Sequence, residues 1–334
     1  MTDAKLLEVK NLKVHFGIGT GGLFGKAVGA IKAVDDISFE IGRGETLGLV
    51  GESGSGKTTV GRAILRALSP TAGEVLFHTN GGVTDVTQLS GKALFRFRKH
   101  MQLIFQDPYS SLNPRMTVRD IIAEPLECQN FGSRAEIDER VREIAAKCKL
   151  NVEHLRRFPH AFSGGQRQRI CIARALAASP EFIVCDESVS ALDVSIQAEV
   201  LNLLMDLQQE LGLTYLFIAH DLSVVAQIST RVAVMYVGRL VEFAPTEKIF
   251  FGPKHPYTKA LLSAVPIVDP DKEFDPMRLE GEIPNPANVP SGCRFHTRCP
   301  FAQDRCRSET PAWREIDDDH FVACHFAEDL AAPH

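Results

Sequence analysis

The sequence lacks any apolar run that approaches the roughly 18 residues of a membrane-spanning helix. Residues 1–5 also lack the apolar core of a secretory signal peptide. Basic residues are not in excess, since 37 Lys and Arg stand against 42 Asp and Glu and give a formal net charge of −5 at pH 7. These absences predict a cytosolic chain that reaches a membrane only through a partner, and they argue against broad nucleic-acid binding.

The paired cysteine knuckles of structural zinc sites, with two to four residues between the cysteines, are absent too. Four of the eight cysteines, at positions 128, 148, 171 and 185, are scattered and predict plain thiols in a reducing compartment. The other four follow a proline-rich connector and are Cys293, Cys299, Cys306 and Cys324. Four thiolates can hold zinc or an iron–sulfur cluster, and the irregular spacing with the Cys299–Pro300 step favours the cluster.

One stretch carries more chemistry than any other. It begins at Gly51, has the sequence Gly-Glu-Ser-Gly-Ser-Gly-Lys-Thr, and lies between the apolar run 46–50 and a helix-compatible segment that ends near Pro70. A strand, a glycine-rich turn, Lys-Thr and a helix form the context of a phosphate-binding P-loop. The glycines let backbone N–H groups wrap around an anion at a helix N-terminus. Lys57 is expected to reach the β- and γ-phosphates of a nucleotide, with the Thr58 hydroxyl on Mg²⁺, and the bland alternative is a glycine-rich turn before an ordinary helix.

Two adjacent carboxylates close another apolar strand. Asp186 and Glu187 follow the run 182–185, at the carboxyl end of a strand, where ligands bind in open α/β sheets. Burying them without partners would be costly, and Mg²⁺ near Asp186 with a water polarised by Glu187 would supply those partners. His220 follows the run 215–218 and is expected at the same edge of the sheet, although a lone histidine is more often structural.

Apolar runs alternate with helical patterns along the chain. Strands are predicted at about 7–16, 31–41, 46–50, 73–77, 101–105, 182–185 and 215–218, followed by a hairpin at 232–243. Alternation slips at Asn11, which indicates a bulge. Helices are predicted at about 59–68, 117–155, 163–178 and 197–211, whereas the two prolines and the turn formers of 107–114 predict an exposed loop.

The alternation predicts an α/β fold. We expect a P-loop NTPase (RecA-like) core with an antiparallel β edge and a helical insert at about 107–168, plus a small cysteine-rich C-terminal extension. The expected division is residues 1–250 for the nucleotide-binding domain and 251–334 for the extension. Because the extension has few aliphatic residues, we expect metal–ligand bonds to hold it as a core separate from the nucleotide site.

Six motifs occur in one order, and the set resembles the Walker A, Q-loop, signature, Walker B, D-loop and switch histidine of ABC transporter ATPases. These motifs are residues 51–58, Gln106, residues 163–166, residues 182–187, residues 190–193 and His220. Any one of them could be accidental, but the joint occurrence in this order could not. The resemblance spans about residues 5–250.

The resemblance implies that two such subunits enclose two ATP molecules, each bound by the P-loop of one subunit and the signature of the other. Glu187 would orient the attacking water, His220 would contact the γ-phosphate, and Gln106 would link Mg²⁺ to the membrane-subunit interface. Thr58, Gln106 and Asp186 would hold Mg²⁺. The residues implied in nucleotide binding are Phe16, Gly51, Ser53, Gly54, Ser55, Gly56, Lys57, Thr58, Thr59, Gln106, Ser163, Gly164, Gly165, Gln166, Asp186 and Asp193. Phe16 would stack on the base, and a core phenylalanine at a strand end is an equal alternative.

Three further segments are more specific. Residues 107–114, 158–162 and 255–262 resemble the oligopeptide and dipeptide importer ATPases, which carry this kind of C-terminal extension. Phe162 stands where the general signature has Leu, and the peptide group tolerates that change. Some of these ATPases carry a 4Fe-4S cluster on C-terminal cysteines, so the resemblance implies a cluster, with zinc as the alternative, on the four cysteines between 293 and 324.

The implied function is ATP hydrolysis that energises import of di- or oligopeptides, by a peripheral subunit on the cytoplasmic face of the inner membrane. Its partners would be a second, homologous ATPase, two transmembrane permeases and, through the complex, an extracytoplasmic solute-binding protein, with no nucleic acid. Relatives also handle nickel chelates and sugars, so another solute stays open. The rival classes are a non-transport ABC ATPase, which usually has tandem cassettes or long coiled coils, and an iron–sulfur redox sensor with an ATPase attached.

Overall fold

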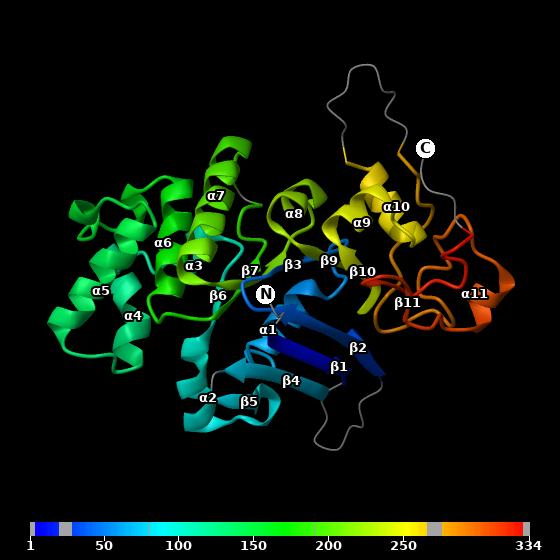
Figure 1. The fold of residues 1–334 in the computed structure, drawn as a ribbon, viewed down its shortest axis with the longest axis horizontal. Coiled ribbons are helices and arrows are strands. Elements are labelled where there is room, and N and C mark those ends of the chain that lie inside the picture. Colours follow the sequence, from blue (N-terminus) through cyan, green and yellow to red (C-terminus); the bar gives the residue numbers. More distant parts are fainter. Residues whose placement is uncertain (1–3, 20–28, 80, 191, 266–275, 330–334) are drawn as a thin grey trace.

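The computed structural model describes residues 4–19, 29–79, 81–190, 192–265 and 276–329. Its strands form two sheets, one of eight strands and one of four. Figure 1 shows three regions around the central helix α1 (Lys57–Ile64): a helical region with α3 to α6 on one side, the four-stranded sheet below, and the C-terminal part with α9 to α11 on the other side. None of the described helices is long and apolar enough to cross a membrane.

The eight-stranded sheet has a parallel centre and an antiparallel edge. Its order is β11-β12-β10-β9-β3-β8-β7-β6. The parallel strands are β3 (Thr46–Val50), β6 (Met101–Ile104), β7 (Phe182–Asp186), β8 (Thr214–Ile218) and β9 (Arg231–Tyr236). The antiparallel strands are β10 (Arg239–Pro245), β11 (Arg314–Asp317) and β12 (His320–Val322). β3, β7 and β8 are buried along their whole length, as continuous apolar runs require in a parallel sheet covered on both faces.

The second sheet is antiparallel throughout and has the order β2-β1-β4-β5. It is formed by β1 (Lys5–Ile18), β2 (Gly29–Gly42), β4 (Ala72–Thr79) and β5 (Gly82–Asp85). The bulge expected at Asn11 is confirmed, because Asn11 has φ 47 and the pairing of β1 shifts register between Val9 and Leu12. Antiparallel strands therefore occur both in this second sheet and at the edge of the eight-stranded sheet.

The helices follow the predicted pattern only in part, because the segment predicted at 117–155 is divided into α4, α5 and a short turn, and several short helices were not predicted. Besides α1, the helices are α2 (Gly91–Phe97), α3 (Pro108–Ser111), α4 (Val118–Cys128), α5 (Arg134–Lys147), α6 (Gly164–Leu176), α7 (Val194–Leu211), α8 (Leu222–Ile228), α9 (Thr246–Phe251), α10 (Pro256–Ser263) and α11 (Asp304–Ser308), with short 3₁₀ turns at 86–88, 98–100, 152–154 and 159–161. α1 ends at Ile64 rather than near 68, because Arg66 takes a left-handed φ of 53. Part of the predicted loop 107–114 forms α3, because the Asp107 carboxylate caps its amides and Pro108 suits a first helical turn.

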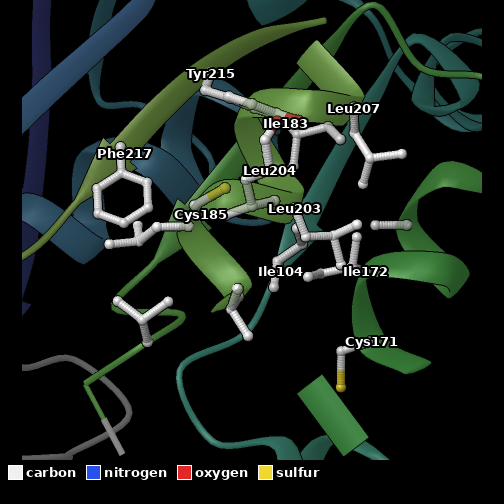
Figure 2. Packing of buried hydrophobic residues seen from close by; sticks show 14 of the residues in the cluster. Ile104, Cys171, Ile172, Ile183, Cys185, Leu203, Leu204, Leu207, Tyr215 and Phe217 are labelled. Carbon is white, nitrogen blue, oxygen red and sulfur yellow. Dashed lines mark hydrogen bonds between the residues drawn. The ribbon is translucent and has the colours of Figure 1, made fainter. Parts of the chain in front are cut away.

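The core beneath the carboxyl ends of the central strands is closely packed. Figure 2 shows Leu203, Leu204 and Leu207 of α7 against Ile183 and Cys185 of β7, with side chains of β8 beside them. The hydroxyl of Tyr215, which is fully buried, donates to the Leu204 carbonyl at 3.1 Å. Such packing leaves the loops that follow β7 and β8 little freedom in position.

The C-terminal extension shares a core with the nucleotide-binding part of the chain. β12 pairs with β10, so the extension adds two strands to the main sheet. Phe295 is 1% exposed, and its ring centroid lies 5.2 Å from that of Tyr236 in β9. The separate core expected for the extension is therefore wrong, because a segment poor in aliphatic residues is stabilised by aromatic packing and strand pairing with β9 and β10.

Candidate active site

The P-loop connects β3 to α1, and two of its glycines are required by contact as well as by φ. A Cβ on Gly51, at φ 150, would lie 2.1 Å from the Met235 carbonyl oxygen. A Cβ on Gly56, at φ 108, would lie 2.2 Å from the Ala33 carbonyl oxygen. The loop therefore lies directly against the backbone of β9 and β2, which leaves no room for a side chain at either position.

Lys57 and Thr58 open α1 and face the rest of the site. Lys57 is 4% exposed, and its ammonium donates to the carbonyl oxygens of Gly51 at 2.6 Å and Glu52 at 2.9 Å. Burial lowers its pKa. The Thr58 hydroxyl donates to Asp186 Oδ1 at 2.8 Å. Burial raises the pKa of Asp186, which is 4% exposed at the end of β7. Two oxygen donors that meet here suit a hard cation such as Mg²⁺.

The Glu187 carboxylate is the meeting point of three strand ends. Gln106, which follows β6, donates through Nε2 to Glu187 Oε2 at 2.8 Å. His220, which follows β8, has Nδ1 3.4 Å from the same oxygen. A small cavity of about 70 Å³ lies beside them and is lined by Glu187, His220 and neighbouring residues. The three residues proposed for catalysis are thus brought together, although they are spread over more than a hundred positions of sequence.

The backbone of Glu187 has an unusual conformation for a residue with a side chain. Its φ is 49, in the left-handed region, and its N–H donates to the Ile218 carbonyl at 2.9 Å. The Ser190 hydroxyl donates to the Glu187 carbonyl at 2.9 Å. Strained backbone of this kind persists where surrounding contacts fix it, which is common at functional sites.

The signature residues lie apart from the P-loop of the same chain. Ser163 caps α6 and forms a capping box with Gln166, and a Cβ on Gly164 would lie 3.7 Å from both Tyr109 and Leu192. Figure 1 shows α6 in the helical region, away from α1. This separation agrees with a signature that acts on the nucleotide of another subunit.

Two further predicted residues have defined places. Asp193 caps α7 by accepting from the Ile196 N–H at 3.0 Å, and this hydrogen bond lowers its pKa. Ala191, in the same motif, lies outside the described residues. Phe16 is 41% exposed and pairs with Ile31 of β2, two residues from Ala33 and the P-loop contact. An exposed aromatic ring at that place is available to a base.

The four C-terminal cysteines line one small cavity of about 20 Å³, together with His255, Phe295 and Phe301 among others. All four are free thiols. Burial raises the pKa of Cys293 to about 11 and that of Cys299 to about 12. Within the described residues, however, no three His, Cys, Asp or Glu side chains are placed to hold a metal ion.

Sequence patterns missed two contacts to the P-loop. The Tyr257 hydroxyl accepts from the Glu52 N–H at 2.8 Å, and the Arg298 guanidinium donates to both Glu52 carboxylate oxygens at 2.7 and 3.0 Å. Both residues belong to the C-terminal extension, far from the P-loop in sequence. No local pattern could have signalled them, because the pairing is created by the packing of the extension.

Comparison with known proteins matches two parts of the chain to known families. Residues 34–190 match the ABC transporter family, and residues 241–306 match the family "Oligopeptide/dipeptide transporter, C-terminal region". The chain is 50% identical over 323 residues to the oligopeptide transport ATP-binding protein AppF of Bacillus subtilis, which covers 96% of this chain and 97% of that protein.

The chain belongs to the ABC transporter ATPases.

Solved structures agree with this ABC ATPase membership. A post-hydrolysis dimer of the ATP-binding cassette MJ0796, bound to ADP and Pi, has a TM-score of 0.61 and 27% identity over 72% of this chain and 99% of that one. The cbiO1 protein of Clostridium perfringens, part of the transporter complex cbiONQ, has a TM-score of 0.61 and 26% identity over 74% and 91%. The predicted cassette fold is confirmed, and as an ABC ATPase the chain hydrolyses ATP in coupling to transport.

Proposed function

We propose that this ABC ATPase energises the import of di- or oligopeptides. The observation that carries the proposal is the match of residues 241–306 to the C-terminal region of oligopeptide and dipeptide transporters. The near full-length identity to an oligopeptide transport ATP-binding protein supports the same substrate class. The division into a cassette of residues 1–250, with its helical insert at about 107–168, and an extension of residues 251–334 is part of this proposal.

Within the site, residues 51–59 hold the phosphates of ATP, and Phe16 stacks on the base. Thr58, Asp186 and Gln106 hold Mg²⁺, and the 2.8 Å contact between the Thr58 hydroxyl and Asp186 supports this donor set. When bound, Mg²⁺ neutralises charge on the phosphate oxygens. Lys57 adds a positive charge from a buried position.

Glu187 acts as the residue that orients and deprotonates the attacking water. Its carboxylate is held by Gln106 and has His220 within 3.4 Å, so it is fixed in direction. His220 contacts the γ-phosphate, and Gln106 links Mg²⁺ to the membrane-subunit interface. Ser163, Gly164, Gly165 and Gln166 complete the site of a second, homologous subunit, and Asp193 is a further nucleotide-binding residue.

The partners proposed are that second ATPase, two transmembrane permeases and, through them, an extracytoplasmic solute-binding protein. The chain lies on the cytoplasmic face of the membrane in this assembly. Closure on ATP and reopening after hydrolysis drive the permeases between their two faces.

The test is uptake by the intact transporter in cells that lack other peptide importers. Radiolabelled di- and tripeptides should accumulate with the wild-type chain, and the Glu187→Gln chain should reduce uptake to background while still copurifying with two permeases. Uptake of a nickel chelate in place of peptides, or purification without any permease, would contradict the proposal.

We also propose a 4Fe-4S cluster on Cys293, Cys299, Cys306 and Cys324. The shared cavity supports the proposal, since four free thiols line it, that of Cys306 buried and the other three partly buried. A zinc ion requires all its sulfur ligands at about 2.3 Å from one centre. A cluster instead spreads four thiolates over four iron atoms, and the irregular spacing of the four cysteines favours it over zinc. When bound, the cluster supplies four sulfur–metal bonds that cross-link the extension.

Purification under anaerobic conditions tests the cluster. The protein should be brown, with iron and acid-labile sulfide in equal amounts, and Cys299→Ser should bleach it. Cys128→Ser is the matched control, because this exposed cysteine lies in the helical region. Colourless protein with one zinc and no sulfide would establish zinc instead.

A further inference from the structure

Glu52 is the second residue of the P-loop, and it is held at three points. Its carboxylate receives both donors of the Arg298 guanidinium, at 2.7 and 3.0 Å. Its N–H donates to the Tyr257 hydroxyl at 2.8 Å, and its carbonyl accepts from the Lys57 ammonium at 2.9 Å. Two of these three contacts come from the C-terminal extension.

The two groups that reach Glu52 are themselves fixed. The Arg298 side chain is only 8% exposed, and its guanidinium lies 6.0 Å from the centre of the Tyr236 ring. Tyr257 is fully buried, with its ring centroid 4.6 Å from that of Tyr236. Because neither side chain is free to rearrange, little side-chain conformational entropy is lost when each hydrogen bond to Glu52 forms.

The charge of Glu52 explains why such a contact is needed. The loop of residues 51–58 is suited to a polyanion, and an unpaired carboxylate beside it would repel phosphate. A bidentate guanidinium–carboxylate pair cancels that charge and also fixes the direction of the side chain. The Tyr257 hydroxyl fixes the backbone of the same residue.

We propose that Arg298 and Tyr257 are positioning residues for the nucleotide site. Arg298 neutralises and orients Glu52, and Tyr257 holds its backbone, so the extension completes the P-loop from outside the cassette. This inference rests on the proposed ATP site at residues 51–58. Both residues act through their contacts to Glu52.

The test compares ATP dissociation constants of full-length chains. Arg298→Ala should weaken ATP binding about tenfold, the scale of a lost charged hydrogen-bond pair that leaves its partner unpaired. Arg305→Ala is the matched control, since Arg305 also directly precedes a cysteine but pairs with the exposed Glu309 at the end of α11. Its ATP affinity should equal that of the wild type.

A second substitution separates charge from structural damage. Adding Glu52→Gln to Arg298→Ala removes the unpaired carboxylate, so affinity should return to within about threefold of the wild type. Arg298→Lys keeps the positive charge but loses the bidentate guanidinium geometry. Its ATP affinity should lie between those of the wild type and Arg298→Ala. Thermal midpoints are recorded for every variant, and a merely structural role would lower the midpoint of Arg298→Ala without rescue by Glu52→Gln.

Lys57→Ala separates the two proposals. If the wild type and Lys57→Ala bind ATP equally, the ATP site itself is wrong and the inference fails with it. If Lys57→Ala loses binding while Arg298→Ala binds as well as the wild type, the inference alone is overturned. Equal weakening by Arg298→Ala and Arg305→Ala, or no rescue by Glu52→Gln, would overturn it as well.

Discussion

Single atoms decide much of the nucleotide site. The hydroxyl of Thr58 reaches Asp186, and one carboxylate oxygen of Glu187 has both Gln106 and His220 within 3.4 Å. Gly51 and Gly56 must lack a side chain, because a Cβ at either position would overlap a neighbouring carbonyl oxygen. Substitutions at this scale therefore separate groups that act on ATP from groups that shape the loop.

Gly56→Ala should abolish measurable ATP binding and lower stability by about 1–3 kcal/mol, because the new Cβ would overlap the Ala33 carbonyl at a φ that disfavours side chains. Gly54→Ala is the control, since φ is 79 there but no atom lies within 4 Å of the added Cβ. ATP titration and thermal denaturation of both variants check this. Equal loss in the two would show that backbone strain, and not overlap, is responsible.

Glu187→Gln should retain ATP binding while hydrolysis falls about a hundredfold or more, because an amide cannot accept the proton of the attacking water. Glu181→Gln is the matched control, because Glu181 lies just before β7 and pairs with Arg43 and His100 and not with the residues of the nucleotide site. Single-turnover hydrolysis in the assembled complex is the measurement. Turnover near the wild-type rate in Glu187→Gln would remove Glu187 from its proposed role.

The start of helix α10 helps to hold the nucleotide site in place. α10 begins at Pro256, and its N-cap is His255, whose Nδ1 accepts from the Tyr257 N–H at 3.1 Å. The same helix start presents the Tyr257 hydroxyl to Glu52. A buried histidine that must accept a hydrogen bond makes this cap sensitive to pH, with the Glu242 carboxylate facing it.

Stability should fall as pH drops from about 6.5 to 4. Burial lowers the pKa of His255 to about 4, whereas an unfolded histidine titrates near 6.5, so the unfolded chain binds the proton first. The stabilisation is complete above pH 6.5 and declines by up to about 3 kcal/mol toward pH 4. His255→Asn keeps a capping acceptor without this titration, and its stability should depend less on pH. The free energy of unfolding in urea is measured for the wild type and His255→Asn at several pH values across this range. An equal dependence on pH in the two proteins would show that His255 is not the titrating group.

Across the whole molecule, the extension and the cassette share one core. Phe295 packs against Tyr236 and Tyr257, and β12 continues the sheet beyond β10. Aromatic packing of this kind couples the unfolding of both parts. The only tryptophan, Trp313, stacks on Phe321, so its fluorescence reports on the extension where it meets the cassette.

Phe295→Ala should cost about 3–5 kcal/mol, because it removes a fully buried ring. Phe251→Ala, at a ring 84% exposed, should change stability by less than about 0.5 kcal/mol. Urea unfolding of the wild type, followed by Trp313 fluorescence and far-ultraviolet circular dichroism, should give coincident transitions. An earlier fluorescence transition would mean that the extension unfolds alone.

The sequence by itself determined the P-loop, the order of the six motifs and most strands, because turn residues and apolar periodicity act over a few neighbouring positions. Only the tertiary structure decided which distant residues meet. Glu187, Gln106 and His220 converge because parallel strands end at one edge of the sheet. Arg298 reaches Glu52 across 246 positions, and the extension joins the main sheet through β12, because long-range packing leaves no local pattern in the chain.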